Sequence, residues 1–302
     1  MDSAEGVRIM AKLDQPEFDV AVLQLPGHPC CPGCAGPIVS KLILRALGKN
    51  VIFFGTGGCG GWTAKKVPCF SLHFSGVGTG AAGIASALEM RGREDIQVVS
   101  FAGDGGTSDI GLAKLSACAE RGDNILHFCC DNEGYMNTGI QKSHLTPYGA
   151  WTSTTPVGKA TRKKDMPMIM AYHYIPYVAT ATVAYTEDFI RKSRKAASIR
   201  GFKYIHVLQP CPTGWRYPPD RTVEMSRLAV QTRMWNLYEI ENGTFRVTLK
   251  PRPRPVTDYL SLQGRFAHLR KERVEEIQAR ADDDWKRLEW LDGRNMWTPW
   301  VS

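Results

Sequence analysis

Residues 98–109 read VVSFAGDGGTSD, in which a mainly apolar run is followed at once by glycines and an acid. An apolar run such as 98–101 is typical of a strand in a parallel sheet that is covered on both sides. Glycines after the strand let the backbone turn sharply and approach a ligand closely. Asp104 adds a hard oxygen ligand, and a helix predicted over 110–121 would point free N–H groups at the same place. The stretch therefore predicts a phosphate or metal site where a parallel strand ends.

The same alternation of apolar runs and helical patterns continues along most of the chain. Apolar runs predict further strands at 51–54, 125–130, 177–182 and 204–208. Helical patterns lie between the strands, at 36–47, 79–91, 110–121 and 186–200. This order predicts an α/β fold with a doubly wound, mostly parallel sheet, whose ligands bind beyond the carboxyl ends of the strands.

A second polar turn follows the next predicted strand, where residues 131–139 read DNEGYMNTG. One helix and one strand separate it from Asp104, so a parallel sheet would bring the two turns side by side. The Asp104 carboxylate, the Asn132 side-chain oxygen and the Gly134 carbonyl would then offer three oxygens to Mg²⁺, which also keeps substrate phosphates among its ligands. A glycine-rich turn followed by a helix, a strand and this asparagine is the signature of thiamine-diphosphate enzymes. A purely structural turn that caps the strand is the alternative.

Composition and charge limit the class of protein. Residues 1–20 contain no apolar core of a signal peptide, and no run approaches the roughly 20 apolar residues of a membrane span. We therefore expect a cytoplasmic protein with reduced cysteines. The net charge of +8 comes without a basic block interleaved with aromatics, so nucleic acid is not an expected partner. A solvated basic surface or an acidic protein partner would explain the charge.

Three cysteines lie close together in HPCCPGCAG, residues 28–36. Cys31 and Cys34 form a CxxC pair that suits a disulfide, a structural zinc or an iron–sulfur cluster, and the pair alone does not decide among them. Cys118, in a predicted helix, and Cys129 and Cys130, in a predicted strand, are expected in the core.

The pattern changes after residue 215. A helix is predicted near 222–232, an extended arm at PRPRP (251–255) and a charged helix near 269–290. Four tryptophans crowd the last 18 residues: Trp285, Trp290, Trp297 and Trp300. We expect two parts, a cofactor-binding domain over 1–215 and a C-terminal extension for subunit contacts over 216–302.

Several motifs together resemble a known family. CPGC, GDGGTSDIG, DNEGYMNTG, TPYGAWT and PCPTGWRYPP are similar to segments of the beta subunit of pyruvate:ferredoxin oxidoreductase and its 2-oxoacid:ferredoxin relatives, over roughly residues 25–240. The resemblance implies a subunit that binds thiamine diphosphate, Mg²⁺ and one [4Fe–4S] cluster.

The resemblance also implies which residues form the sites. Cys31, Cys34, Cys59 and Cys211 match the cluster ligands, and Asn137 matches an asparagine that faces the substrate. Two isolated cysteines far from the pair favour a cluster over zinc, which usually takes two short-spaced pairs. The cofactor-binding residues implied are Gly58, Cys59, Gly103, Asp104, Gly105, Gly106, Asn132, Gly134, Asn137 and Thr138.

The function implied is the oxidative decarboxylation of a 2-oxoacid, pyruvate first, to acyl-CoA and CO₂, with electrons passing through the cluster to ferredoxin. The partners implied are coenzyme A and further subunits: a pyrimidine-binding alpha type, which supplies a catalytic glutamate, a gamma type and a ferredoxin-like delta type. Gly60 and Gly61 replace serines of the family, and CAG at 34–36 replaces CGE, so a larger oxoacid such as phenylglyoxylate or a branched oxoacid, or oxalate, is the alternative. A non-oxidative thiamine-dependent decarboxylase or synthase and a zinc-stabilised interaction subunit are further alternatives.

Overall fold

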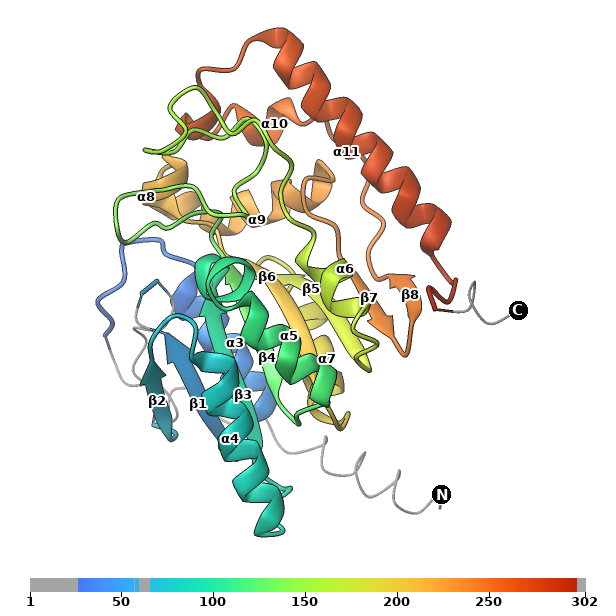
Figure 1. Ribbon diagram of the computed structural model, residues 1–302. Coiled ribbons are helices and arrows are strands. Elements are labelled where there is room, and N and C mark those ends of the chain that lie inside the picture. The colour runs from blue at the N-terminus through green and yellow to red at the C-terminus, as the bar shows by residue number, and fades with distance from the viewer. Residues whose placement is uncertain (1–26, 57, 60–65, 298–302) are drawn as a thin grey trace.

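The structure, a computed structural model, describes residues 27–56, 58–59 and 66–297. Its centre is an eight-stranded sheet in the order β2-β1-β3-β4-β6-β5-β7-β8 (Figure 1). The strands from β2 to β5 in this order are parallel, whereas β7 pairs antiparallel with both β5 and β8. The parallel strands are β1 (Val51–Thr56), β2 (Cys69–Leu72), β3 (Gln97–Gly103), β4 (Leu126–Asp131), β5 (Tyr177–Thr182) and β6 (Lys203–Leu208).

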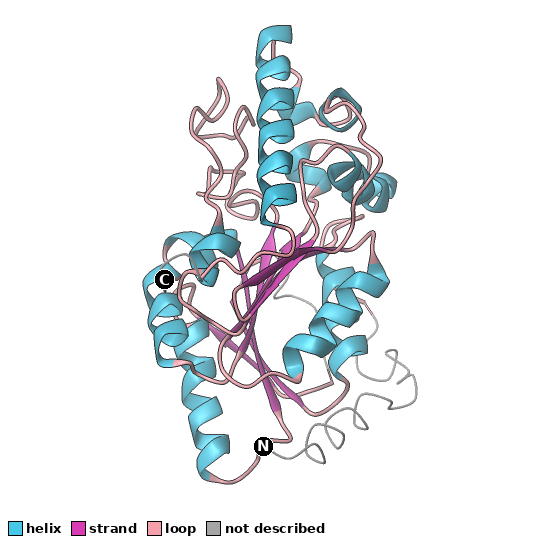
Figure 2. Cartoon of the chain, turned by 90° about the vertical axis from the view of Figure 1, so that its right-hand side faces the viewer, coloured by secondary structure: helices cyan, strands magenta, loops and turns pink. Residues whose placement is uncertain are grey.

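Helices cover both faces of the sheet, and an apolar core lies beneath each layer (Figure 2). One face is covered by α3 (Gly36–Leu47) and α7 (Thr186–Ala197). There, Phe189 of α7 stacks on Phe128 of β4 with 6.2 Å between ring centroids. The other face is covered by α4 (Val77–Met90), α5 (Leu112–Arg121) and α6 (Met166–Ala171). No helix among the described residues is both long enough and apolar enough to cross a membrane.

Local sequence explains where these helices begin and end. Helix α7 carries Glu187 and Asp188 in its first turn and Arg194 and Lys195 in its last, which complements the helix dipole at both ends. Helix α5 ends at Gly122, whose left-handed conformation (φ 69°, ψ 29°) closes the last turn without a steric cost.

The C-terminal extension adds two strands to the same sheet and a group of helices at one end of it. Strands β7 (Tyr238–Glu241) and β8 (Thr244–Val247) form a hairpin whose turn residues, Asn242 and Gly243, both have positive φ, as a two-residue type I′ turn requires. Its helices gather with α8 (Pro212–Trp215) at one end of the sheet (Figure 1): α9 (Thr222–Gln231), α10 (Thr257–Leu260) and α11 (Lys271–Leu291). They share an apolar cluster that includes Trp215, Tyr259 and Ile277.

The predicted fold class is confirmed, and each predicted strand and helix is present with small shifts at its ends. The elements that were not predicted are β2, the short helices α6, α8 and α10, and the β7–β8 hairpin. Strand β2 has only four residues and is largely exposed, so it lacks the buried pattern that identified the others. The hairpin was marked by its Asn-Gly turn, which is a strong hairpin signal. The arm at 251–255 contains no helix or strand, as expected.

Candidate active site

The two predicted turns meet at one cavity at the carboxyl ends of β3 and β4, with a volume of about 170 Å³. Its walls include nine of the ten predicted cofactor-binding residues: Gly58, Cys59, Gly103, Asp104, Gly105, Asn132, Gly134, Asn137 and Thr138. Gly106 is not a wall residue. A Cβ added to it would lie 3.1 Å from the Ala102 side chain and 3.2 Å from the Phe74 carbonyl oxygen. The parallel pairing of β3 with β4 thus brings together residues that are distant in the sequence.

Three oxygen-bearing groups converge inside this cavity. One terminus of the Asn132 amide lies 2.7 Å from the Gly134 carbonyl oxygen and 3.1 Å from Asp104 Oδ1. If that terminus is nitrogen, it donates to both; if it is oxygen, three oxygens face one another. Neighbouring ligands of an octahedral Mg²⁺ with bonds of 2.0–2.1 Å lie about 2.9 Å apart, so the observed spacing fits the edges of such a site.

Asp104 is placed where a cation would compensate its charge. It is 2% exposed, and Ser143 Oγ donates to its Oδ2 at 2.6 Å. Burial and the nearby Asp131 carboxylate raise the pKa of Asp104 well above its usual range, although the hydrogen bond from Ser143 opposes that shift. Sequence reasoning missed Ser143, because it lies 39 residues from Asp104 and only the folded loop brings it there.

The glycine-rich turn is shaped by the aromatic wall of the cavity. Gly105 begins a π-helical turn, η1 (Gly105–Asp109), which precedes α5. A Cβ at Gly105 would overlap the Tyr135 ring, and Tyr135 itself donates to Asp109 Oδ2 at 2.8 Å. The turn therefore requires glycine at position 105 to keep Tyr135 in the wall.

The four predicted cluster cysteines come from three segments: Cys31 and Cys34 from the loop before α3, Cys59 from the turn after β1 and Cys211 from the start of α8. Cys34 Sγ accepts from Gly36 N–H at 3.4 Å, and Cys211 Sγ accepts from Gly214 N–H at 3.3 Å at the start of α8. Burial raises the pKa of Cys34 to about 12 and that of Cys59 to about 11, and neighbouring cysteines add to both shifts. Cys211 is one of these neighbours for both thiols, so Cys34, Cys59 and Cys211 lie close enough for their charges to interact.

The cysteine set is not drawn together as a formed site. Within the described parts of the chain, no three His, Cys, Asp or Glu side chains are spaced to hold a metal ion. The donor chemistry nevertheless fits a cluster. Cys211 and Cys59 add to the raised pKa of Cys34, and Cys211 and Cys31 add to that of Cys59. Backbone N–H groups also point at Cys34 and Cys211, in the manner that stabilises thiolate ligands. Cys30, which is not among the four predicted ligands, also contributes to the raised pKa of Cys34 and so lies near that thiol.

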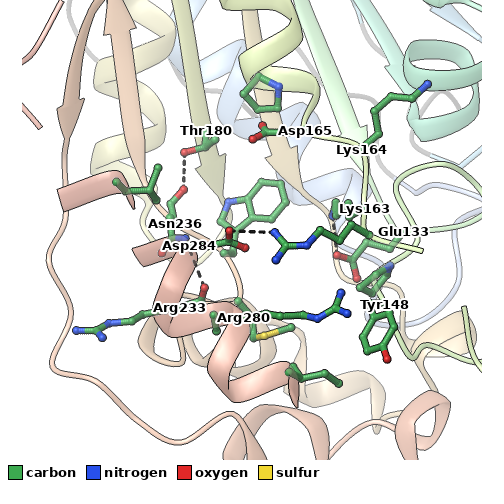
Figure 3. Close-up of a pocket in the computed structure, with 18 of the residues that line it drawn as sticks. Glu133, Tyr148, Lys163, Lys164, Asp165, Thr180, Arg233, Asn236, Arg280 and Asp284 are labelled. Carbon is green, nitrogen blue, oxygen red and sulfur yellow. Dashed lines mark hydrogen bonds and ion pairs between the residues drawn. The ribbon is translucent and has the colours of Figure 1, made fainter. Parts of the chain in front are cut away.

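Glu133 points away from the proposed metal ligands. Its carboxylate pairs with Lys163 at 2.7 Å and with Arg265 at 2.6 Å. It lines a second cavity, of about 340 Å³, in which Lys163 lies beside it (Figure 3). Two further cations in this cavity are paired with acids, Arg280 with Glu276 and Arg287 with Asp165, so it contains structural ion pairs rather than converging oxygens.

Some predicted features lie outside the described residues. Gly60 and Gly61, on which the argument for a larger substrate depends, are among them, as are Trp300 and the N-terminal 26 residues. Of the other tail tryptophans, Trp285 is buried beneath the Arg233 guanidinium, 4.7 Å from its ring centroid, and Trp290 is 63% exposed.

The chain is similar to several known proteins. Residues 55–207 match the family described as thiamine pyrophosphate enzyme, C-terminal TPP binding domain. The pyruvate synthase subunit PorB of Methanothermobacter marburgensis is 50% identical over 270 residues, which cover 85% of this chain and 94% of that protein. The ketoisovalerate oxidoreductase subunit VorB of Pyrococcus abyssi is 44% identical over 88% of this chain and 92% of its own length.

Two more similar proteins have other 2-oxoacids in their names. The beta subunit of NADH-dependent phenylglyoxylate dehydrogenase from Aromatoleum evansii is 43% identical over 87% of this chain and 63% of its own length. The solved structure of 2-oxoglutarate:ferredoxin oxidoreductase from Magnetococcus marinus shares the fold, with a TM-score of 0.59 at 20% identity over 71% of this chain and 82% of that one. On sequence and fold together, the chain belongs to the thiamine-diphosphate-binding beta subunits of the 2-oxoacid:ferredoxin oxidoreductase family.

Proposed function

We propose that this chain is the cofactor-binding subunit of a complex that oxidatively decarboxylates a 2-oxoacid, with pyruvate as the main substrate, and passes the electrons to ferredoxin or a similar acceptor. The observation that carries the proposal is the convergence of Asp104, Asn132 and the Gly134 carbonyl in a cavity behind a glycine-rich turn. Relatives at 43–50% identity that act on 2-oxoacids support it.

The roles of the residues follow from their positions. Asp104, Asn132 and the Gly134 carbonyl would hold Mg²⁺ against the diphosphate, and the backbone of residues 103–106 would lie along the diphosphate itself. Asn137 and Thr138 are exposed and line the cavity, where they would contact the substrate. Thiamine diphosphate, when bound, supplies the carbanion chemistry of decarboxylation. The protein orients that cofactor and excludes water from its buried side.

Cys31, Cys34, Cys59 and Cys211 would hold one [4Fe–4S] cluster that accepts electrons from this site. Asp104 is among the charges that raise the pKa of the Cys59 thiol, so the proposed cluster and metal sites adjoin. The raised pKa values of Cys34 and Cys59 mean that both thiols are protonated at neutral pH without a metal. Cluster assembly would therefore release protons, as metal binding to thiols does.

Single Cys→Ser changes test this ligand set. We expect lower iron content in each of four variants: Cys31→Ser, Cys34→Ser, Cys59→Ser and Cys211→Ser. Each should also lose absorption at roughly 400 nm, the band of a thiolate-bound cluster that dithionite bleaches. Cys30→Ser is the matched control, because Cys30 adjoins the pair without matching the motif. If Cys211→Ser keeps the wild-type iron content, Cys211 is not a cluster ligand. If Cys30→Ser loses iron, Cys30 rather than Cys31 is the ligand.

The substrate is tested on the assembled complex. A viologen dye serves as acceptor for pyruvate, 2-oxoglutarate, phenylglyoxylate, a branched oxoacid and oxalate, with and without coenzyme A. We expect the highest kcat/KM with pyruvate and coenzyme A. A preference for phenylglyoxylate or the branched oxoacid would assign the alternative instead, and turnover without any acceptor would indicate a non-oxidative decarboxylase.

The proposal also includes partners and location. The complex would contain alpha-, gamma- and delta-type subunits, and it would work in the cytoplasm with ferredoxin. Subunit names among the relatives support a multi-subunit enzyme. Copurification from the native host, followed by identification of the subunits, tests this composition.

A further inference from the structure

The loop that carries the proposed Mg²⁺ ligands is held from behind by buried charges. Glu133 stands between Asn132 and Gly134 with a left-handed backbone (φ 68°), which is uncommon for a residue with a side chain. Its N–H donates to Asp131 Oδ1 at 2.9 Å, and Lys163 pairs with both acids at 2.6 and 2.7 Å. A strained conformation of this kind persists only where the surroundings fix it.

A second contact that fixes the loop comes from α8, the short helix that follows Cys211. Trp215 is fully buried, and its Nε1 donates to the Asn132 carbonyl oxygen at 2.8 Å. In the same turn, a Cβ at Gly214 would overlap Met136, which lines the cofactor cavity. The turn that presents Cys211 is therefore packed directly on the loop that presents Asn132 and Gly134.

Arg265, from the C-terminal extension, contacts both Glu133 and Trp215. It is 2% exposed, its Nη2 donates to Glu133 Oε2 at 2.6 Å, and its guanidinium lies 3.9 Å from the centroid of the Trp215 ring. Gln263 orients it by accepting from its Nε at 2.8 Å, and the Arg265 carbonyl accepts from Trp151 N–H at 2.9 Å. The edge of a planar guanidinium can pair with a carboxylate while its face stacks on a ring, and an ammonium has no such face to stack.

We propose that Arg265 is a positioning residue for the Mg²⁺–diphosphate site: by pairing with Glu133 and stacking on Trp215, it fixes the loop that carries Asn132 and Gly134. The inference rests on the proposed function and adds a role for residues 216–302 within the site itself. Groups that orient metal ligands from behind typically change metal affinity by about 10–100-fold when removed.

The test uses the assembled complex and Mn²⁺ as the probe for the Mg²⁺ site, read by electron paramagnetic resonance in the presence of thiamine diphosphate. Arg265→Met is expected to weaken Mn²⁺ binding by about 10–100-fold. Arg265→Lys should restore part of the affinity through Glu133. Trp215→Phe keeps a ring for the guanidinium but removes the bond to Asn132, so it should weaken binding on its own.

Matched variants separate positioning from general destabilisation. Lys192→Met removes another fully buried cation, which pairs with Asp188 at 2.6 Å on α7, and it should leave the Mn²⁺ affinity unchanged. Glu133→Gln combined with Arg265→Met should cost less than the sum of the two single changes, because both act through one contact. If Arg265→Met does not assemble, Arg265→Lys and Trp215→Phe carry the test.

The outcomes distinguish this inference from the proposed function. Unchanged Mn²⁺ affinity in Arg265→Met or, failing that, in Arg265→Lys and Trp215→Phe would overturn the positioning role while leaving the site itself in place. An equal loss in Lys192→Met would reduce the role of Arg265 to stability. Wild-type complex that binds neither Mn²⁺ nor thiamine diphosphate would overturn the proposed function and this inference with it.

Discussion

Asp104→Ala is expected to lower the affinity of the assembled complex for thiamine diphosphate by at least ~30-fold in the presence of Mg²⁺. The change removes a buried anionic ligand, and truncating one partner of a buried charge pair typically costs about 2–5 kcal/mol. Each 1.4 kcal/mol corresponds to about a factor of ten in affinity. Isothermal titration calorimetry with the intact complex measures the loss directly.

Asp104→Asn separates the charge of this residue from its shape. Without a cation, burial raises the pKa of Asp104 and favours its neutral form, so an amide of the same size should leave the stability of the metal-free protein nearly unchanged. The amide keeps one oxygen toward Mg²⁺ but loses the charge, so the affinity should fall less than in Asp104→Ala. Wild-type affinity in Asp104→Ala would place the diphosphate elsewhere.

The sequence predicted every parallel strand except β2, because those strands are mostly buried. Strands such as β4 and β6 are buried along their whole length, which gives a mainly apolar run that predicts a strand covered on both faces. Strand β2 and the β7–β8 hairpin lie at the edges, where short and partly exposed strands leave a weaker pattern.

The site was predictable where a motif brings its ligands within one turn of the chain. Asp104, Asn132 and Gly134 lie in such turns, at the ends of adjacent strands. Ser143 and Arg265 were not predictable, because they come from irregular segments with no periodic pattern, and only tertiary packing places them against Asp104 and Glu133. The residues that hold a metal ligand in place are more scattered in sequence than the ligands themselves.

The described walls of the cofactor cavity account for only part of a thiamine-diphosphate site. At about 170 Å³ the cavity is smaller than the roughly 300–1,000 Å³ that is usual for pockets enclosing a ligand of drug size. Asp104 is the only acid among its described lining residues, and the proposed metal would engage it. In the family that the chain belongs to, the resemblance implies that a glutamate from a separate pyrimidine-binding domain activates the cofactor.

We therefore expect the isolated chain to retain its iron, to bind thiamine diphosphate weakly and to reduce no viologen with any 2-oxoacid. Adding an alpha-type subunit should raise the rate from background to a measurable turnover, because the partner would close the cavity and supply the missing glutamate. An alpha-type subunit with that glutamate changed to glutamine is the matched control, since it would close the cavity and tighten cofactor binding without restoring turnover. Oxoacid-dependent dye reduction by the isolated chain would show that the activating acid lies within this polypeptide, and the interface argument would then be wrong.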